Sequence, residues 1–191
     1  MNAPLPPRSP ARPHRFTMDD LRAMVAAGVI EEGAKIELIE GELVDMAAEG
    51  GRHTDWVSAV GRWLISGLDL SFVVVPGSTL PLSEMVGPKP DWWVFPAALR
   101  TEDVRGPDVL LAIEISDSTL AYDLGEKAAL YARHGVRDYW VVQVETRQLY
   151  VHRDPAADGY GYRCRFEADD SVAALLIPNL SLALKDLPRV G

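Results

Sequence analysis

A glutamate lies inside one of the most apolar stretches of the 191-residue sequence. Residues 109–115 read Val-Leu-Leu-Ala-Ile-Glu-Ile, a pattern typical of a strand that is covered on both faces, so we expect the carboxylate of Glu114 to be buried. An unpaired buried charge costs several kcal/mol, and a cation, a metal ion or a proton must therefore accompany it. A structural ion pair would meet this need, and so would a catalytic site.

A second carboxylate could lie next to Glu114. Asp91 follows Lys-Pro at the start of the apolar segment 90–95, and a strand there could bring it beside the strand of Glu114. Two adjacent carboxylates repel each other unless a divalent ion lies between them, and hard oxygen ligands of this kind suit Mg²⁺ or Mn²⁺. Taken alone, an aspartate after proline is also a common turn or cap residue.

A lysine is the third candidate. Lys127, Leu130, Tyr131 and His134 recur at helical spacing, which predicts that the lysine lies on the apolar, sheet-facing side of a helix. There it could neutralise Glu114 as a structural pair, or it could orient an attacking water and offset charge that develops on a phosphate oxygen. The spacing does not decide between these roles.

The hydrophobic pattern predicts the elements that would position these residues. We expect helices over 18–27, 53–70 and 123–134, core strands over 72–75, 90–95, 109–116 and 138–144, hairpins over 35–46 and 148–166, and an apolar closing segment over 175–187. This order predicts an α/β (α+β) fold, with a central mixed sheet flanked by helices and extra hairpins toward both ends. A proline-rich flexible tail is expected over 1–16, followed by a single domain over 17–191.

Composition excludes several classes of protein. The net charge of −9 argues against a generally basic nucleic-acid coat, and the lone Cys164 permits neither an internal disulfide nor a zinc knuckle. No apolar run approaches the roughly 20 residues of a membrane helix, so we expect a soluble, cytoplasmic protein without a membrane partner. The absence of a Walker loop, a dinucleotide fingerprint and a Gly-x-Ser-x-Gly elbow argues against nucleotide-driven or serine-hydrolase chemistry.

Several motifs in one order resemble the Uma-two family of endonucleases, within the PD-(D/E)xK nuclease superfamily. They are Lys-Pro-Asp at 89–91, Ile-Glu-Ile-Ser-Asp-Ser-Thr at 113–119, Gly-Glu-Lys-Ala-Ala-Leu-Tyr at 125–131 and Gly-Val-Arg-Asp-Tyr-Trp-Val-Val at 135–142. The similarity extends upstream to Glu-Leu-Ile-Glu-Gly-Glu at 37–42 and to His53, and it covers nearly everything between 17 and 187.

The resemblance implies a restriction endonuclease-like core that hydrolyses phosphodiester bonds in DNA with Mg²⁺ or Mn²⁺. By that similarity, Asp91 and Glu114 would be the metal carboxylates, and the backbone carbonyl of Ile115 a further ligand. The residue two positions after Glu114 is Ser116 rather than the lysine of the superfamily's name. The lysine role would therefore pass to Lys127 in the following helix.

Other polar residues are further candidates with more than one interpretation. His53 could be a metal neighbour, a proton carrier or a residue that begins a helix. Glu37 and Glu40 could be site residues or surface charges of the first hairpin, and Tyr131 shares the helix face of Lys127.

The charge is distributed unevenly along the chain. Residues 17–126 hold 7 basic and 20 acidic side chains, a net of −13, whereas 127–165 hold 7 basic and 4 acidic, a net of +3. Arg133 and Arg137 could therefore face phosphates near Lys127. The overall acidity also favours a competing hypothesis, in which the fold is a catalytically silent binding or assembly module with a structural Glu114–Lys127 pair.

Tandem aromatic residues could stack on bases, pack in a core or form a subunit interface. They are Trp92, Trp93, Tyr131, Tyr139 and Trp140. We favour the interface, and with it a homodimer, which the family resemblance also implies and which could address both strands of a duplex.

Overall fold

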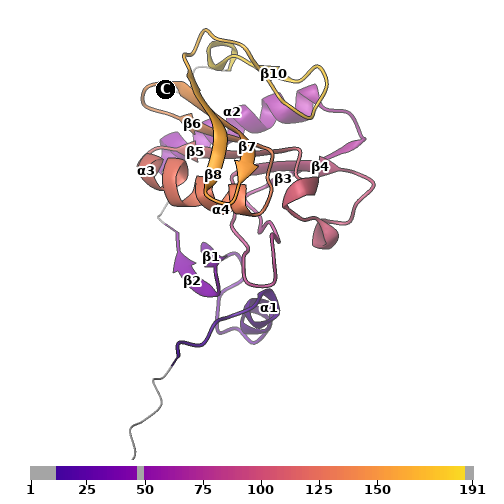
Figure 1. The fold of residues 1–191 in the computed structure, drawn as a ribbon, viewed down its shortest axis with the longest axis vertical. Coiled ribbons are helices and arrows are strands. Elements are labelled where there is room, and N and C mark those ends of the chain that lie inside the picture. The colour runs from indigo at the N-terminus through magenta and orange to yellow at the C-terminus, as the bar shows by residue number, and fades with distance from the viewer. Residues whose placement is uncertain (1–11, 47–49, 188–191) are drawn as a thin grey trace, which may run out of the picture.

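The computed structural model describes residues 12–46 and 50–187 (Figure 1). Most of the expected tail therefore lies outside the described residues. Its last two residues belong to the folded structure, because both contact the first hairpin. The Arg15 side chain donates hydrogen bonds to the carbonyl oxygen of Glu40 and to the carboxylate of Glu42. The amide of Phe16 donates to the carbonyl oxygen of Gly41. No described helix is long and apolar enough to cross a membrane.

A six-stranded mixed sheet forms the centre, in the order β3-β4-β5-β6-β7-β8. The strands are β3 (Phe72–Pro76), β4 (Trp92–Pro96), β5 (Leu111–Ser116), β6 (Asp138–Gln143), β7 (Gln148–Ala156) and β8 (Gly159–Phe166). Only β5 and β6 pair in parallel, as the helical connection between them requires, and the other neighbours are antiparallel. The predicted second hairpin, 148–166, is part of this sheet rather than an addition to it, because β7 pairs with β6 along its first six residues.

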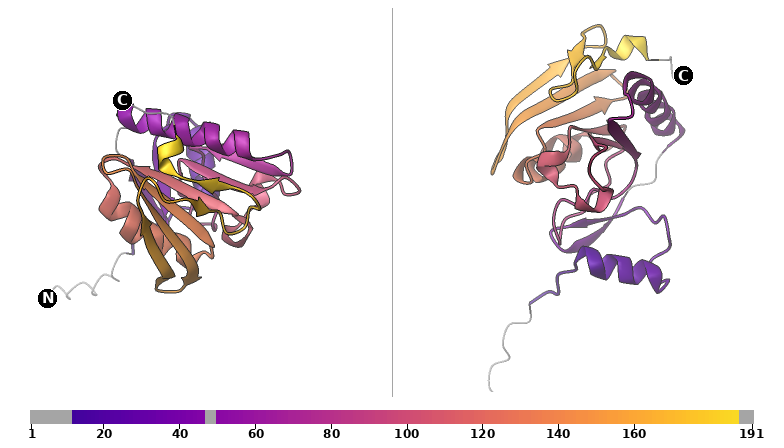
Figure 2. Two further views of the ribbon diagram at one scale, coloured as in Figure 1. Left: turned by 90° about the horizontal axis from the view of Figure 1, so that it is seen from above. Right: turned by 90° about the vertical axis from the view of Figure 1, so that its right-hand side faces the viewer.

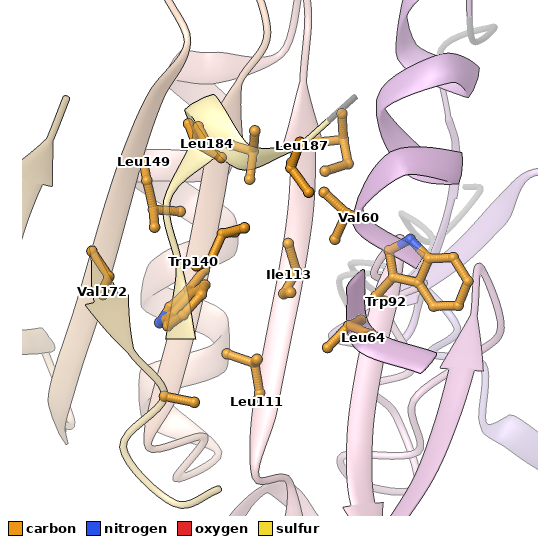
Figure 3. Packing of buried hydrophobic residues seen from close by; sticks show 14 of the residues in the cluster. Val60, Leu64, Trp92, Leu111, Ile113, Trp140, Leu149, Val172, Leu184 and Leu187 are labelled. Atoms are coloured by element: carbon orange, nitrogen blue, oxygen red, sulfur yellow. The ribbon is translucent and has the colours of Figure 1, made fainter. Parts of the chain in front are cut away.

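One face of the sheet is covered by α2 (Gly51–Gly67), the first long helix. Val60 and Leu64 of α2 pack in a single cluster with Ile113 and Trp140 of the sheet (Figure 3). The helix approaches closely at Gly61, where an added Cβ would lie 2.2 Å from the Trp92 ring. A small residue is therefore required at the point where α2 crosses β4.

The opposite face is covered by a helical segment from 120 to 133 (Figure 2). It consists of α3 (Leu120–Tyr122), a π-helical turn η3 (Asp123–Lys127) and α4 (Ala128–Arg133). In the sequence, Asp123 and Glu126 are typical of a helix N-terminus and predict that the helix over 123–134 begins with Asp123 as its cap, and this prediction was wrong. The helix begins three residues earlier, and the Asp123 carboxylate accepts a hydrogen bond from the Thr119 hydroxyl instead of capping backbone amides.

A small unit at the N-terminal end lies below the sheet in Figure 1. It consists of α1 (Met18–Ala26), β1 (Ile36–Ile39) and β2 (Glu42–Asp45). A capping box formed by Thr17 and Asp20 begins α1, and Glu40 and Gly41 turn the hairpin with positive φ angles of 50° and 80°. The unit is joined to the loop between β3 and β4 by paired backbone hydrogen bonds between Leu38 and Gly87.

The C-terminal segment returns to the face that α2 covers. A two-stranded sheet, β9 (Val172–Ala173) and β10 (Ser181–Leu182), precedes the short helix η4 (Leu184–Asp186). The apolar closing segment predicted over 175–187 thus contributes Leu184 and Leu187 to the core.

Two further single-turn helices, η1 (Thr101–Asp103) and η2 (Gly106–Asp108), lie between β4 and β5.

The aromatic residues expected at a subunit interface are instead core residues, which corrects that interpretation. Trp93, Tyr131, Tyr139 and Trp140 are fully buried, and Trp92 keeps 8% of its surface exposed. Successive side chains of a strand point to opposite faces of the sheet. Because both faces of this sheet are covered, two aromatic residues next to each other in the sequence can both be buried. The homodimer stays a prediction from the family resemblance, without support from these aromatic side chains.

Candidate active site

Three charged side chains from three separate elements meet in the interior. Glu114 extends from the middle of β5 toward the helical segment, where its Oε1 lies 2.9 Å from the Nζ of Lys127. The same ammonium lies 3.1 Å from Oε1 of Glu37 on β1. The side chains of Glu37 and Lys127 are 0% and 1% exposed, and that of Glu114 is 6% exposed. Two carboxylates thus share one ammonium without water as a screen.

The electrostatics of this cluster depend on burial. Burial and the neighbouring carboxylates raise the pKa of Glu114 well above its ordinary value, although Lys127 opposes the shift. Burial alone would lower the pKa of Lys127, but Glu114 and Glu37 more than offset this and raise it. The lysine is therefore held as a cation, and Glu114 is the group for which a proton or another cation is most favourable.

Tyr131 fixes one oxygen of Glu114. Its hydroxyl, one turn after Lys127, donates a hydrogen bond of 2.9 Å to the same Oε1 that the lysine contacts. Burial and the nearby Glu114 charge raise the pKa of this tyrosine, so its hydroxyl stays a donor. The other oxygen of Glu114, Oε2, accepts no hydrogen bond from any described residue. The helical segment thus holds the carboxylate from one side and leaves one oxygen available.

Asp91 is anchored at the beginning of β4, where β4 and β5 are neighbours. Its Oδ2 accepts a hydrogen bond of 2.6 Å from the amide of Ile115, the residue that follows Glu114. Its Oδ1 lies 3.3 Å from Nε2 of His53, near the start of α2. The main chain of β5 therefore positions Asp91, and the three residues enclose one end of the site.

Sequence reasoning missed Asp123 as a site residue. Its buried side chain accepts a hydrogen bond of 2.6 Å from Thr119, and burial raises its pKa despite that bond. The residue lies four positions before Lys127, a spacing that puts both on one helix face. That spacing could have identified it, had Asp123 not been interpreted as a helix cap.

These side chains line a pocket of about 350 Å³. Its charged or titratable members are Lys35, His53, Lys89, Asp91, Glu114, Asp117, Asp123 and Lys127. Lys35 and Lys89 were not considered as site residues, although Lys89 belongs to the Lys-Pro-Asp motif. Glu37 lies behind Lys127 rather than in the pocket wall, and the Lys89 amide donates a hydrogen bond of 2.6 Å to it.

Two arginines expected near the lysine lie elsewhere. Arg133 pairs with Glu40 at 2.7 Å on the exposed surface, and Arg137 donates to the carbonyl oxygen of Pro107. Neither lines the pocket. Both face away from the pocket because they lie on the outer side of the helical segment and in the turn after it. The excess of basic residues in this part of the sequence therefore does not surround the pocket.

The donor set suits a hard divalent cation. Carboxylates from Asp91, Glu114 and Asp123 border one pocket in which Lys127 is the fully buried counter-charge, and this excess of negative charge at low dielectric favours a cation. Within residues 12–46 and 50–187, no three His, Cys, Asp or Glu side chains are grouped closely enough to hold an ion unaided. Two carboxylates would therefore need the Ile115 carbonyl or water to complete the coordination.

A mixed sheet lies between α2 and the helical segment 120–133, and an acidic pocket beside β4 and β5 contains a buried lysine from that segment. This arrangement defines the restriction endonuclease-like class of fold. The chain belongs to the Uma2 family, whose model is described as "putative restriction endonuclease" and matches residues 18–185.

A solved structure supports the same fold. The chain is similar to a protein from Anabaena variabilis described as "a putative nuclease belonging to DUF820", with a TM-score of 0.65 and 19% identity. The similarity covers 90% of this chain and 96% of that one. Among curated proteins, none matches the chain.

Proposed function

We propose that this protein is a metal-dependent nuclease that hydrolyses phosphodiester bonds in DNA. The observation that carries the proposal is the convergence of Asp91, Glu114 and Lys127 on one pocket, each held by partners that fix its position. Family membership supports the reaction class, and the acidic donor set supports the use of Mg²⁺ or Mn²⁺.

The residues of the site have distinct roles in this proposal. Asp91, Glu114 and the Ile115 carbonyl would hold the cation. When bound, such a cation would supply a nucleophile at neutral pH and neutralise charge on the phosphate. Lys127 uses two of its three N–H groups on Glu37 and Glu114, which leaves one for a phosphate oxygen or an attacking water. Tyr131 keeps Glu114 oriented, and His53 beside Asp91 can carry a proton at the pocket wall.

Cleavage by matched variants tests the proposal. Supercoiled plasmid is incubated with wild type, Asp91→Asn and Glu114→Gln in Mg²⁺, in Mn²⁺ and in EDTA. Nicking by wild type only with metal, and at least 100-fold slower nicking by both variants, is the expected result. Asp169→Asn serves as the control, because that carboxylate forms only an exposed pair with Lys185. Equal cutting by all four proteins would overturn the proposal.

The second candidate is a catalytically silent binding or assembly module. Two features favour it, namely the closed Glu37–Lys127–Glu114 cluster and the lack of a three-residue ion-binding group in the described part of the chain. Titration calorimetry with Mn²⁺ separates the two functions. A saturable heat that Glu114→Gln abolishes supports the nuclease, whereas no heat with the folded wild type supports the module.

A further inference from the structure

A second, larger pocket opens beside the candidate active site. Its volume is about 750 Å³, and it lies between α1, the loop that follows it and the residues around Thr79 and Thr101. Gly33, Ala34 and Lys89 line both pockets, so the two are adjacent and share one wall. A ligand long enough to cross this shared wall at Lys89 could contact both pockets.

Lys89 marks the junction of the two pockets. Its half-buried ammonium donates a hydrogen bond of 2.7 Å to the carbonyl oxygen of Ala34. This ammonium forms no ion pair with a carboxylate anywhere in the described part of the chain. Glu37 accepts a hydrogen bond from the backbone amide of Lys89 and not from its side chain. An ammonium with two remaining donors at the boundary of a phosphodiesterase pocket is suited to a phosphate group.

The larger pocket itself has a different character. Leu21, Val25 and Ile30 give it an apolar wall, whereas Glu31 and Glu32 lie at its exposed rim. Acidic groups disfavour a phosphate but accept hydrogen bonds from the amino groups of bases. Apolar walls with a few polar groups are also typical of pockets for small planar ligands, and this volume is within their usual range.

From these observations we infer that Lys89 binds the phosphate next to the cleaved bond and that the larger pocket receives the base and sugar attached to it. A base can enter such a pocket only when it is outside the duplex stack. The preferred substrate is therefore single-stranded DNA, or a duplex end or junction with an unpaired nucleotide. This inference rests on the proposed nuclease function, because it takes nucleic acid as the ligand.

Binding without catalysis tests the inference. A fluorescein-labelled 12-nucleotide single strand and the matching duplex are titrated in EDTA and followed by fluorescence anisotropy. Lys89→Met should weaken single-strand binding at least fivefold and reduce the slope of log affinity against log salt by about 0.7. Lys89→Arg should restore most of the affinity, and Lys185→Met, which removes an exposed surface lysine, should change nothing.

A pair of tryptophan variants on α1 tests the pocket. Ala26 lines the larger pocket and Ala23 does not, although both are exposed. Ala26→Trp should fill the entrance and weaken single-strand binding at least fivefold with little effect on the duplex, whereas Ala23→Trp should behave as wild type. Circular dichroism verifies that each variant is folded.

The inference and the proposed function can fail separately. It is overturned if wild type prefers the duplex or binds no single strand, if Lys89→Met binds within twofold of wild type, or if the two tryptophan variants agree. A protein that shows the expected binding but never cuts DNA with metal refutes the nuclease proposal alone. A protein that cuts with metal but binds independently of Lys89 and Ala26 refutes this inference alone.

Discussion

Lys127 forms an ion pair of 3.1 Å with Glu37, and neither side chain exposes more than 1% of its surface. The two residues come from different parts of the fold, since Glu37 lies on the small N-terminal hairpin and Lys127 on the helical segment behind the central sheet. The N-terminal unit therefore contributes a charge to the interior of the site. Its removal or displacement would alter the lysine that holds Glu114.

Glu37→Gln should destabilise the protein by about 1–3 kcal/mol, because it removes one charged partner of a buried ammonium while it preserves the shape of the side chain. Urea unfolding measures the change. Glu40→Gln on the same hairpin is the matched control, since Glu40 pairs with Arg133 at the surface and should contribute less than about 1 kcal/mol. Equal effects of the two variants would contradict the buried pair.

Lys127→Met should cost about 3–5 kcal/mol at neutral pH, because it leaves Glu37 and Glu114 buried without their counter-charge. The loss depends on pH. Burial already raises the folded-state pKa of Glu114, and removal of the lysine raises it further, so stability is kept where Glu114 is protonated and is lost as pH rises. Denaturant unfolding at pH 5 and pH 8 should therefore show a smaller deficit at pH 5. A deficit that grows toward acid would refute this account.

His152 should make the fold sensitive to acid. Burial, with the nearby Arg163, lowers the pKa of this histidine from 6.5 to about 4, so between these values the unfolded chain binds more protons than the folded one. Stability is complete above pH 6.5 and falls toward pH 4, by at most about 3 kcal/mol from this group. Thermal unfolding of wild type and His152→Gln across this range measures the effect. The stability difference between the two proteins should change with pH, and parallel curves would exclude His152.

Asp138 should hold the C-terminal segment on the sheet. Its fully buried carboxylate accepts hydrogen bonds from Arg153, Trp140 and the amide of Leu175, at 2.8, 2.8 and 2.6 Å. Asp138→Asn should cost about 2–3 kcal/mol, because a neutral amide satisfies these donors poorly. Limited proteolysis should then cut within 167–187 before any other region. The surface variant Asp169→Asn should remain resistant, and identical digestion of both variants would argue against this role.

The strands and the first long helix could be predicted from the sequence because their signals are local. An apolar run marks β5, and a helical stripe marks α2. The burial of Glu114 followed from the same run, since a charge among consecutive apolar residues has few other positions. The roles of Asp91, Glu114 and Lys127 stay predictions, although their convergence on one pocket agrees with them.

The remainder of the site depends on contacts between distant segments. Glu37 alternates with apolar residues as a surface charge of a hairpin would, and only the packing of that hairpin against the helical segment buries it. The helical segment begins at Leu120 rather than at Asp123, and the sequence has no period that distinguishes the π turn at Asp123–Lys127 from an α-helix. Arg133 and Arg137 were expected at the site and lie outside it, because a basic stretch of sequence does not specify the direction of each side chain.

The last strand of the central sheet, β8, has no further partner among the described strands. One row of its backbone amides and carbonyls is thus open to any extended chain that approaches, a condition that can lead to aggregation. Arg163 and Arg165 are carried on this strand, and in a second copy the same cations would approach one another. Mutual repulsion between these cations would oppose edge-to-edge pairing of two β8 strands. Two copies that associate would therefore meet more favourably through another surface.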